Sequence, residues 1–173
     1  LDVTIQAQIL ELMQDLCRRL GVALVIITHN LGIVARYADR VLVMYGGRMV
    51  ECGKASVVLG QPRHLYTAGL LASVPSLDGT PTHRLAAIEG TPPNPLALPP
   101  GCPFAPRCNQ VRMDCHDEPA MRSTDVGSVS ACVRADEMGR GVVRWRPAAV
   151  VVPAQAAAAA AAAAVPPSDD KSP

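Results

Sequence analysis

Apolar positions recur with a helical period over the first twenty residues of the chain. The residues at this spacing are Ile5, Ile9, Leu12, Met13, Leu16, Cys17 and Leu20. Asp2 or Thr4 can serve as the N-cap, and Gly21 can end the helix. Because these apolar residues fall on one face at 3.6 residues per turn, the pattern predicts a helix over residues 3–20.

Residues 22–47 change from a continuous apolar run to shorter segments with turn residues between them. The run VALVII at 22–27 is rich in β-branched residues and apolar on both faces, which predicts a buried strand of a parallel sheet. A short helix is expected from about Asn30 to Ala38, followed by a strand at 40–45. Gly46-Gly47 then predicts a tight hairpin turn, because both positions accept positive φ.

Hydrophobic periodicity weakens in the second half of the chain. The segment LYTAGLLASV at 65–74 predicts a helix that packs through its leucines, and GVVRW at 141–145 predicts a last short strand. Residues 148–173 contain an alanine run between prolines and predict a disordered tail, so the foldable part ends near residue 147.

Composition argues against nucleic-acid binding and against a membrane-spanning segment. The formal net charge is +1, with 16 basic and 15 acidic residues interspersed, so no basic stripe would neutralise a nucleic-acid backbone. Only five aromatic residues are present, which leaves few platforms for stacking bases. No window approaches the roughly 18 large apolar residues of a membrane span. The chain begins at a leucine without a signal-peptide pattern, and we expect it to be cut from something longer.

One histidine follows the apolar run, at a position where ligand-binding or catalytic residues are often found. His29 follows the predicted strand directly, and ligand-contacting residues of open α/β sheets lie at the carboxyl ends of strands. A surface histidine in a strand-to-helix loop explains the same spacing equally well. Asn30 is a suitable cap for the next helix under both interpretations.

The string from LDVTIQAQ through VALVIITHN to MYGGRMVECG resembles the last third of the nucleotide-binding subunit of an ABC transporter. The resemblance implies that His29 is the switch histidine that contacts the γ-phosphate of ATP. It also implies that Asp2 belongs to a loop at the dimer interface, besides its capping role. Asn30 stands where aspartate is more frequent. A neutral imidazole can hold a phosphate oxygen and an attacking water in line, which suits phosphoryl transfer.

Several motifs of that family do not occur in these 173 residues. The sequence contains no G-x-x-x-x-G-K-S/T phosphate loop, no LSGGQ-type signature and no strand ending in Asp-Glu. Without the phosphate-cradling amides, the lysine and the ligands of Mg²⁺, we expect negligible ATPase activity from this chain alone. ATP and Mg²⁺ are therefore expected only in a full-length subunit.

The second half resembles the C-terminal extension of oligopeptide and dipeptide importer ATPases. The residues that carry the resemblance are PRHLYTAGLLASVP at 62–75, IEGTPPNP at 88–95 and GCPFAPRC at 101–108. Leu65 stands where proline is commoner in the family's His-Pro-Tyr-Thr motif. For His64 and Tyr66, packing of the extension onto the ATPase body is favoured over a functional role.

Four of the six cysteines lie in a segment that is poor in periodic apolar residues. Cys102, Cys108, Cys115 and Cys132 have the spacing C-x5-C-x6-C-x16-C, whereas Cys17 and Cys52 fall in predicted regular elements. A segment with so little apolar surface would gain stability from a covalent or metal cross-link. Disulfides are disfavoured in the reducing cytosol where ABC ATPases work.

Two kinds of metal group remain for these cysteines. Zinc is compatible with four thiolates, although its usual C-x2-C knuckle is absent. A 4Fe-4S cluster tolerates more varied spacing, and the resemblance favours it because peptide-importer ATPases carry such a cluster in this extension. A site without metal is the third alternative. His116, next to Cys115, is expected to be exposed, and any cluster is expected to be structural.

The predicted fold class is α/β: the C-terminal part of a P-loop NTPase (ABC ATPase) sheet with helices over residues 1–60, then a small irregular cysteine-containing extension over 61–135. Residues 136–147 are assigned to neither part.

The resemblance implies a subunit of an importer for peptides or nickel. It would lie peripherally on the cytoplasmic face of the inner membrane, paired with a second ATPase subunit and with transmembrane permeases. An extracytoplasmic substrate-binding protein would be an indirect partner. The alternative is a stand-alone cysteine-rich metal-binding module, or a decayed remnant of such an ATPase.

Overall fold

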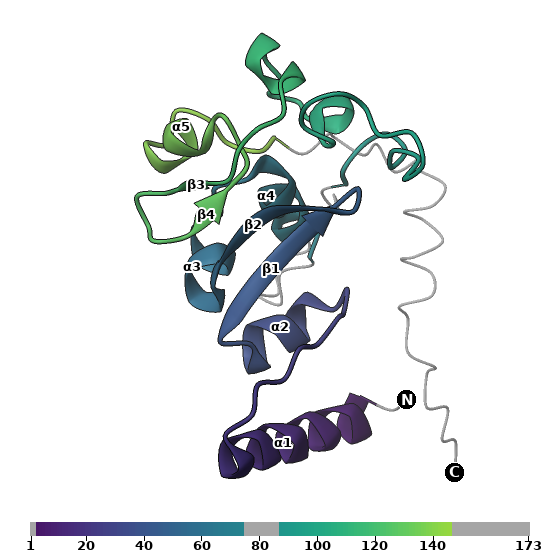
Figure 1. Ribbon diagram of the computed structural model, residues 1–173, viewed down its shortest axis with the longest axis vertical. Coiled ribbons are helices and arrows are strands. Elements are labelled where there is room, and N and C mark those ends of the chain that lie inside the picture. The colour runs from purple at the N-terminus through teal and green to yellow at the C-terminus, as the bar shows by residue number, and fades with distance from the viewer. Residues whose placement is uncertain (1–2, 75–86, 147–173) are drawn as a thin grey trace, which may run out of the picture.

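The computed structural model describes residues 3–74 and 87–146, with helices and strands interleaved along the chain (Figure 1). The first element is helix α1, Val3–Leu20, which confirms the predicted helix. Gly21 adopts φ +66°, and the amide of Val22 donates to the carbonyl of Cys17 at 3.1 Å. This glycine therefore ends α1 as expected, in the left-handed conformation that glycine adopts without strain.

The predicted buried strand at 22–27 is wrong. These residues have no regular secondary structure, and Val25 and Ile27 are 84% and 98% exposed. A strand of a parallel sheet needs neighbouring strands to satisfy its backbone groups and helices to cover its faces. Within residues 3–74 and 87–146 no strand lies beside this segment to do so.

Helix α2, Leu31–Tyr37, follows the exposed segment and confirms the second predicted helix. The side-chain oxygen of Asn30 accepts from the amides of Gly32, at 2.9 Å, and Ile33, at 3.4 Å. Asn30 is thus the N-cap that the sequence predicts. In Figure 1, α1 lies at the bottom of the molecule, with α2 between it and the sheet.

A four-stranded antiparallel sheet forms the centre of the fold, in the order β1-β2-β4-β3. Its long strands are β1, Arg40–Tyr45, and β2, Arg48–Lys54, and the predicted hairpin is confirmed. Gly46 and Gly47 at the turn have φ of +56° and +76°. Two short strands from the second half, β3, Arg122–Ser123, and β4, Val129–Ser130, extend the sheet from β2.

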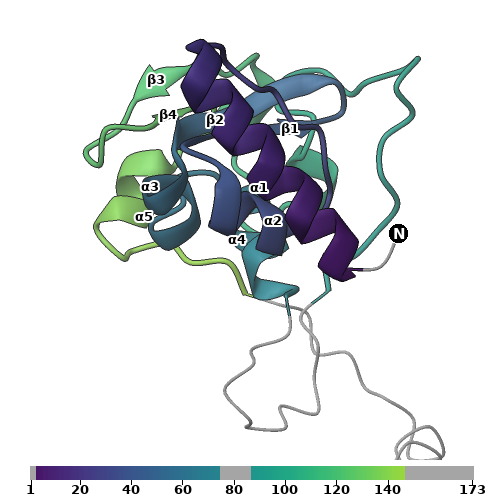
Figure 2. The same ribbon diagram turned by 90° about the horizontal axis from the view of Figure 1, so that it is seen from below.

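Short helices cover the hairpin and link it to the cysteine-containing region. They are α3, Ala55–Gly60, α4, Leu65–Ala72, the 3-10 turns η1, Ala105–Arg107, and η2, Met113–His116, and α5, Ala135–Gly139. Helix α4 confirms the predicted helix after Arg63-His64. Seen from below, α1 crosses in front of α2 and α4, with α3 and α5 on one side (Figure 2).

The predicted strand at 141–145 is also wrong. The amides of Val142 and Val143 both donate to the carbonyl of Glu137, so the chain turns back at the end of α5 instead of extending along the sheet. Val143 is buried, which explains the apolar pattern without a strand. Asp2 and the predicted tail at 148–173 lie outside the described residues.

Aromatic side chains form the centre of the core. Phe104 lies 5.2 Å from Tyr45, 5.3 Å from Tyr66 and 5.8 Å from Trp145, measured between ring centroids. Val50, Leu65 and Val143 complete the buried cluster, against which three of the four clustered cysteines pack. The predicted α/β class is confirmed, and the core joins the hairpin, α4 and the cysteine region. Among the described helices, none is long and apolar enough to cross a bilayer.

Candidate metal centre

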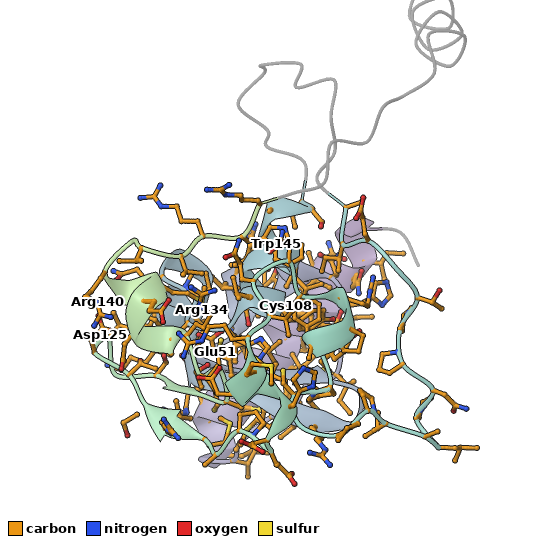
Figure 3. The ribbon with its side chains drawn as sticks, turned by 90° about the horizontal axis from the view of Figure 1, so that it is seen from above. Glu51, Cys108, Asp125, Arg134, Arg140 and Trp145 are labelled. Carbon is orange, nitrogen blue, oxygen red and sulfur yellow. The ribbon has the colours of Figure 1, made fainter. Side chains whose placement is uncertain are left out.

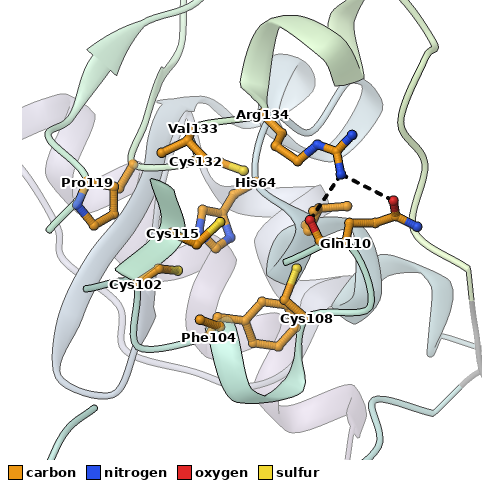
Figure 4. Close-up of a pocket in the computed structure, with 13 residues that line it drawn as sticks. His64, Cys102, Phe104, Cys108, Gln110, Cys115, Pro119, Cys132, Val133 and Arg134 are labelled. Carbon is orange, nitrogen blue, oxygen red and sulfur yellow. Dashed lines mark hydrogen bonds between the residues drawn. The ribbon is translucent and has the colours of Figure 1, made fainter. Parts of the chain in front are cut away.

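The four clustered cysteines line one small cavity of about 20 Å³ (Figure 4). Cys102 and Cys108 flank η1, Cys115 lies within η2, and Cys132 precedes α5. The sequence separates these residues by up to thirty positions, so their gathering is a result of the fold. All six cysteines of the chain are free thiols, and Cys17 and Cys52 lie outside this cavity.

Local backbone bonds fix the loop that carries Cys102 and Cys108. The carbonyl of Cys102 accepts from the amide of Ala105 at 3.0 Å, and the carbonyl of Ala105 accepts from the amide of Cys108 at 3.1 Å. Between them, Phe104 is 1% exposed and anchors the turn in the aromatic core. The prolines around η1 limit the backbone further.

A glycine allows the loop to approach the turn that carries Cys115. The amide of Cys102 donates to the carbonyl of Cys115 at 2.9 Å. Gly101 adopts φ +74°, and a β-carbon there would overlap the carbonyl oxygen of Cys115 and the backbone of His116. Only glycine meets both conditions, so Gly101 sets the approach of the two cysteine-bearing segments.

Cys132 is positioned from the sheet. Its amide donates to the hydroxyl oxygen of Ser130 at 3.2 Å, and that hydroxyl donates to the carbonyl of Arg63 at 2.9 Å. Arg134, two residues further, donates to the backbone carbonyl of Gln110 at 3.1 Å, as Figure 4 shows. These bonds tie the segment of Cys132 both to the start of α4 and to the loop after Cys108.

Glu51 on β2 is the buried anchor of this arrangement. It is fully buried, and its two carboxylate oxygens accept from the amides of Arg63, at 2.6 Å, and His64, at 3.1 Å. Burial raises the pKa of this carboxyl, and the bonds from Arg63 and His64 oppose that rise. In Figure 3, Glu51 and Cys108 lie near the centre of the molecule, whereas Asp125, which pairs with Arg63 at 2.8 Å, lies at its edge.

His64 lines the cysteine cavity and is 1% exposed. Its Nδ1 accepts from the amide of Tyr66 at 3.1 Å, which makes the ring the N-cap of α4. Burial lowers the pKa of this imidazole to about 4, so the ring is neutral at physiological pH. The sequence favours a packing role for His64 and gives no signal that it reaches the cysteines.

The electrostatics of the cavity favour neutral thiols as long as no cation is bound. Burial raises the pKa of Cys102, and it raises the pKa of Cys108 to about 11 and of Cys132 to about 12, in each case with a contribution from neighbouring cysteines. Several thiolates this close together would repel one another. A bound metal reverses that balance, because its charge deprotonates the coordinating thiols.

The donor set of four thiols is chemically compatible with zinc and with an iron-sulfur cluster. Within residues 3–74 and 87–146, no three side chains of Cys, His, Asp or Glu are close enough to hold one metal ion. Zinc would need its sulfurs about 2.3 Å from one point. His116, the other candidate ligand, is exposed as expected and does not line the cavity.

The predicted nucleotide-contacting residues lie apart from the cysteine cavity. His29 is exposed and follows the irregular segment 22–27, and it is not among the residues that line the cavity. Asp2 lies outside the described residues. The structure thus brings the four cysteines together but does not unite them with the residues expected to contact ATP.

Comparison with known proteins shows which family the cysteine-containing region is similar to. Residues 50–115 match the family model for the C-terminal region of oligopeptide/dipeptide transporters. The matched region runs from β2 through the cysteine loops to Cys115, and Cys132 falls beyond it.

Individual relatives extend the match over most of the chain. The oligopeptide transport ATP-binding protein AppD of Bacillus subtilis is 46% identical over 140 residues, which is 80% of this chain and 42% of that protein. OppD of Salmonella typhimurium is 47% identical over 79% of this chain and 41% of its own length. The dipeptide transport ATP-binding protein DppD of Bacillus subtilis is 53% identical over 62% of this chain and 32% of its own length. The chain therefore spans about two fifths of the length of relatives such as AppD and OppD.

Proposed function

We propose that this chain is the C-terminal part of the ATP-binding subunit of an ABC importer for peptides. The observation that carries the proposal is that most of the chain, including the cysteine region, aligns with the same transport proteins. The matches to AppD and OppD cover 80% and 79% of the chain, and they are proteins of oligopeptide transport. The cysteine region matches a family that occurs in such transporters.

The exposed apolar surface of the N-terminal region supports the same proposal. Leu12, Leu16 and Leu20 on α1 are exposed, as are most side chains of segment 22–27. Large exposed apolar patches on soluble proteins mark surfaces that bind other parts of a protein or a partner. In the complete subunit, the remaining parts of the nucleotide-binding domain would cover these side chains.

In that assembly His29 acts as the switch residue at the terminal phosphate of ATP, with Mg²⁺ and the phosphate loop supplied by other parts of the subunit. Asp2 lies in the loop at the interface between two ATPase subunits. The pair drives transmembrane permeases from the cytoplasmic face of the membrane, and a substrate-binding protein delivers the peptide on the other side.

Substitution of His29 tests this function. In the intact subunit assembled with its permeases, we expect His29→Ala to lower ATP turnover and transport by about 10²-fold or more, because the imidazole aligns groups in the transition state. Nucleotide affinity should change little, since other parts of the subunit bind the ground state. His116→Ala, which removes an exposed histidine from the extension, is the matched control and should leave both unchanged. Equal losses of affinity and turnover in His29→Ala would contradict the switch role.

The four cysteines hold a 4Fe-4S cluster in this proposal, with zinc as the competing occupant. Support comes from the four thiols that line one cavity. When bound, the cluster would supply a cross-link between η1, η2 and the segment before α5. The chain's own residues position the thiols through Gly101, Ser130 and Arg134.

A further inference from the structure

One buried hydrogen-bond donor of the cysteine cavity has no partner. Four buried side-chain polar atoms lack a hydrogen bond among the described residues: Tyr37 Oη, His64 Nε2, Thr67 Oγ1 and Trp145 Nε1. Of these residues, only His64 lines the cavity of the four cysteines. Figure 4 shows its ring beside Cys115 and Cys132.

The hydrogen bond on the other side of the ring determines which nitrogen carries the proton. Nδ1 accepts from the amide of Tyr66, so in the neutral imidazole Nδ1 has a free lone pair and Nε2 carries the hydrogen. Nε2 is therefore a donor. No acceptor, sulfur included, lies within hydrogen-bonding distance of it in the described part of the chain.

The ring cannot turn away from the cavity to find water. Its backbone amide is held by the buried carboxylate of Glu51, and the ring packs 6.2 Å from Phe104 between centroids. A donor held in place without an acceptor is destabilising, because it has lost its hydrogen bonds to water. Such a group in a native structure calls for a ligand that accepts its hydrogen.

We propose that the Nε2–H group of His64 donates a hydrogen bond to a sulfur of the iron-sulfur cluster held by the four cysteines. The inference rests on the proposed cluster and assigns His64 a role beyond packing. His64 is a positioning and tuning residue, and the four cysteines remain the ligands. A hydrogen bond to a cluster sulfur stabilises the more negative, reduced form and so raises the reduction potential.

The test is a redox titration of the intact subunit, purified without oxygen, with the reduced cluster followed by electron paramagnetic resonance. His64→Phe keeps the ring but removes the donor, and we expect the ratio of reduced to oxidised cluster at a fixed potential to fall roughly tenfold. For a one-electron couple this is a shift of about 59 mV to more negative potential. His64→Gln retains an N–H donor and should restore much of the wild-type potential. His116→Phe, the exposed control, should titrate like wild type.

The outcomes separate this inference from the proposed function. A wild-type subunit without iron overturns the proposed cluster and with it the role of His64, but leaves the proposed transport function, which His29→Ala tests, untouched. Equal iron content and equal potential in wild type and His64→Phe overturn the role of His64 alone. If His64→Phe fails to retain iron, wild-type protein labelled with ¹⁵N-histidine decides. A weak coupling of the reduced cluster to a histidine N–H that exchanges in D₂O supports the hydrogen bond. No coupling, or one strong enough for a direct nitrogen–iron bond, contradicts it.

Discussion

The two regions of this molecule differ in where their apolar side chains lie. In residues 3–38, Leu12 on α1 is 69% exposed, and Leu10 is the one large apolar side chain described as buried. From β1 onward, Val50, Leu65 and Phe104 are each 1% exposed and pack in one cluster. The first region has the apolar sequence pattern of packed helices, but in the described residues most of its apolar side chains have nothing to pack against. The second has its own core.

This difference shows which parts of the chain carry their folding information within the described residues. Helix α1 forms because its hydrogen bonds are internal, whatever lies on its apolar face. Segment 22–27 does not form a strand, because every backbone hydrogen bond of a strand needs a neighbour. The part of the chain from β1 onward folds around aromatic residues and a buried carboxylate that it supplies itself.

The largest expected contrast is between Phe104 and Leu12. Phe104→Ala should lower the free energy of unfolding by about 3–5 kcal/mol, because it leaves a cavity in the core of the extension. Leu12→Ala should change it by no more than about 0.5 kcal/mol, because the side chain is exposed and alanine favours helix. Chemical denaturation followed by Trp145 fluorescence measures both. Similar losses would mean that the two regions share one core.

The buried anchor Glu51 comes next in expected size. Glu51→Ala leaves the amides of Arg63 and His64 buried without an acceptor, which should cost about 3 kcal/mol. The control is Glu118→Ala, since Glu118 pairs with Arg48 at the surface and its side chain is largely exposed. That substitution should cost no more than about 0.5 kcal/mol. A mild effect of Glu51→Ala in the same denaturation experiment would show that the start of α4 is held by other contacts.

The smallest expected difference in the free energy of unfolding is between alanine substitutions at two glycines. It separates the cost of a steric overlap from the cost of backbone strain. Gly101 and Gly127 both have positive φ, but a β-carbon at Gly127 meets nothing within 4 Å, whereas at Gly101 it overlaps the backbone of Cys115 and His116. Gly127→Ala should cost about 1 kcal/mol from strain alone. Gly101→Ala should cost at least about 1 kcal/mol more and weaken metal retention. Equal costs would mean that the Cys102 loop does not depend on this approach.

Much of the fold followed from sequence pattern. Helices α1, α2 and α4 have apolar patterns typical of helices, Gly21 ends α1 and Asn30 caps α2 as predicted, and the pair Gly46-Gly47 sets the β1–β2 hairpin. The patterns at 22–27 and 141–145 were misleading, because an apolar run reports burial but not what pairs with it. Strands β3 and β4 are two residues long, which is too short for any periodicity to appear.

The cysteines of the candidate site could be predicted from the sequence, but the buried residues that position them could not. Free thiols in a segment with little apolar surface pointed to Cys102, Cys108, Cys115 and Cys132. Glu51 and His64 gave no comparable signal, because a charged residue in a strand and a histidine before a helix are both common on surfaces. Their burial arises from long-range packing of β2, α4 and β4, which the sequence does not express locally.

The most direct test of the account is metal analysis of the intact subunit purified without oxygen, beside its Cys108→Ser variant. We predict about four irons and matching sulfide per chain, with the broad visible absorption of a 4Fe-4S cluster. These should be lost in Cys108→Ser and retained in Cys52→Ser, whose thiol lies outside the cavity. One zinc per chain, or no metal in the wild-type subunit, would contradict the central claim.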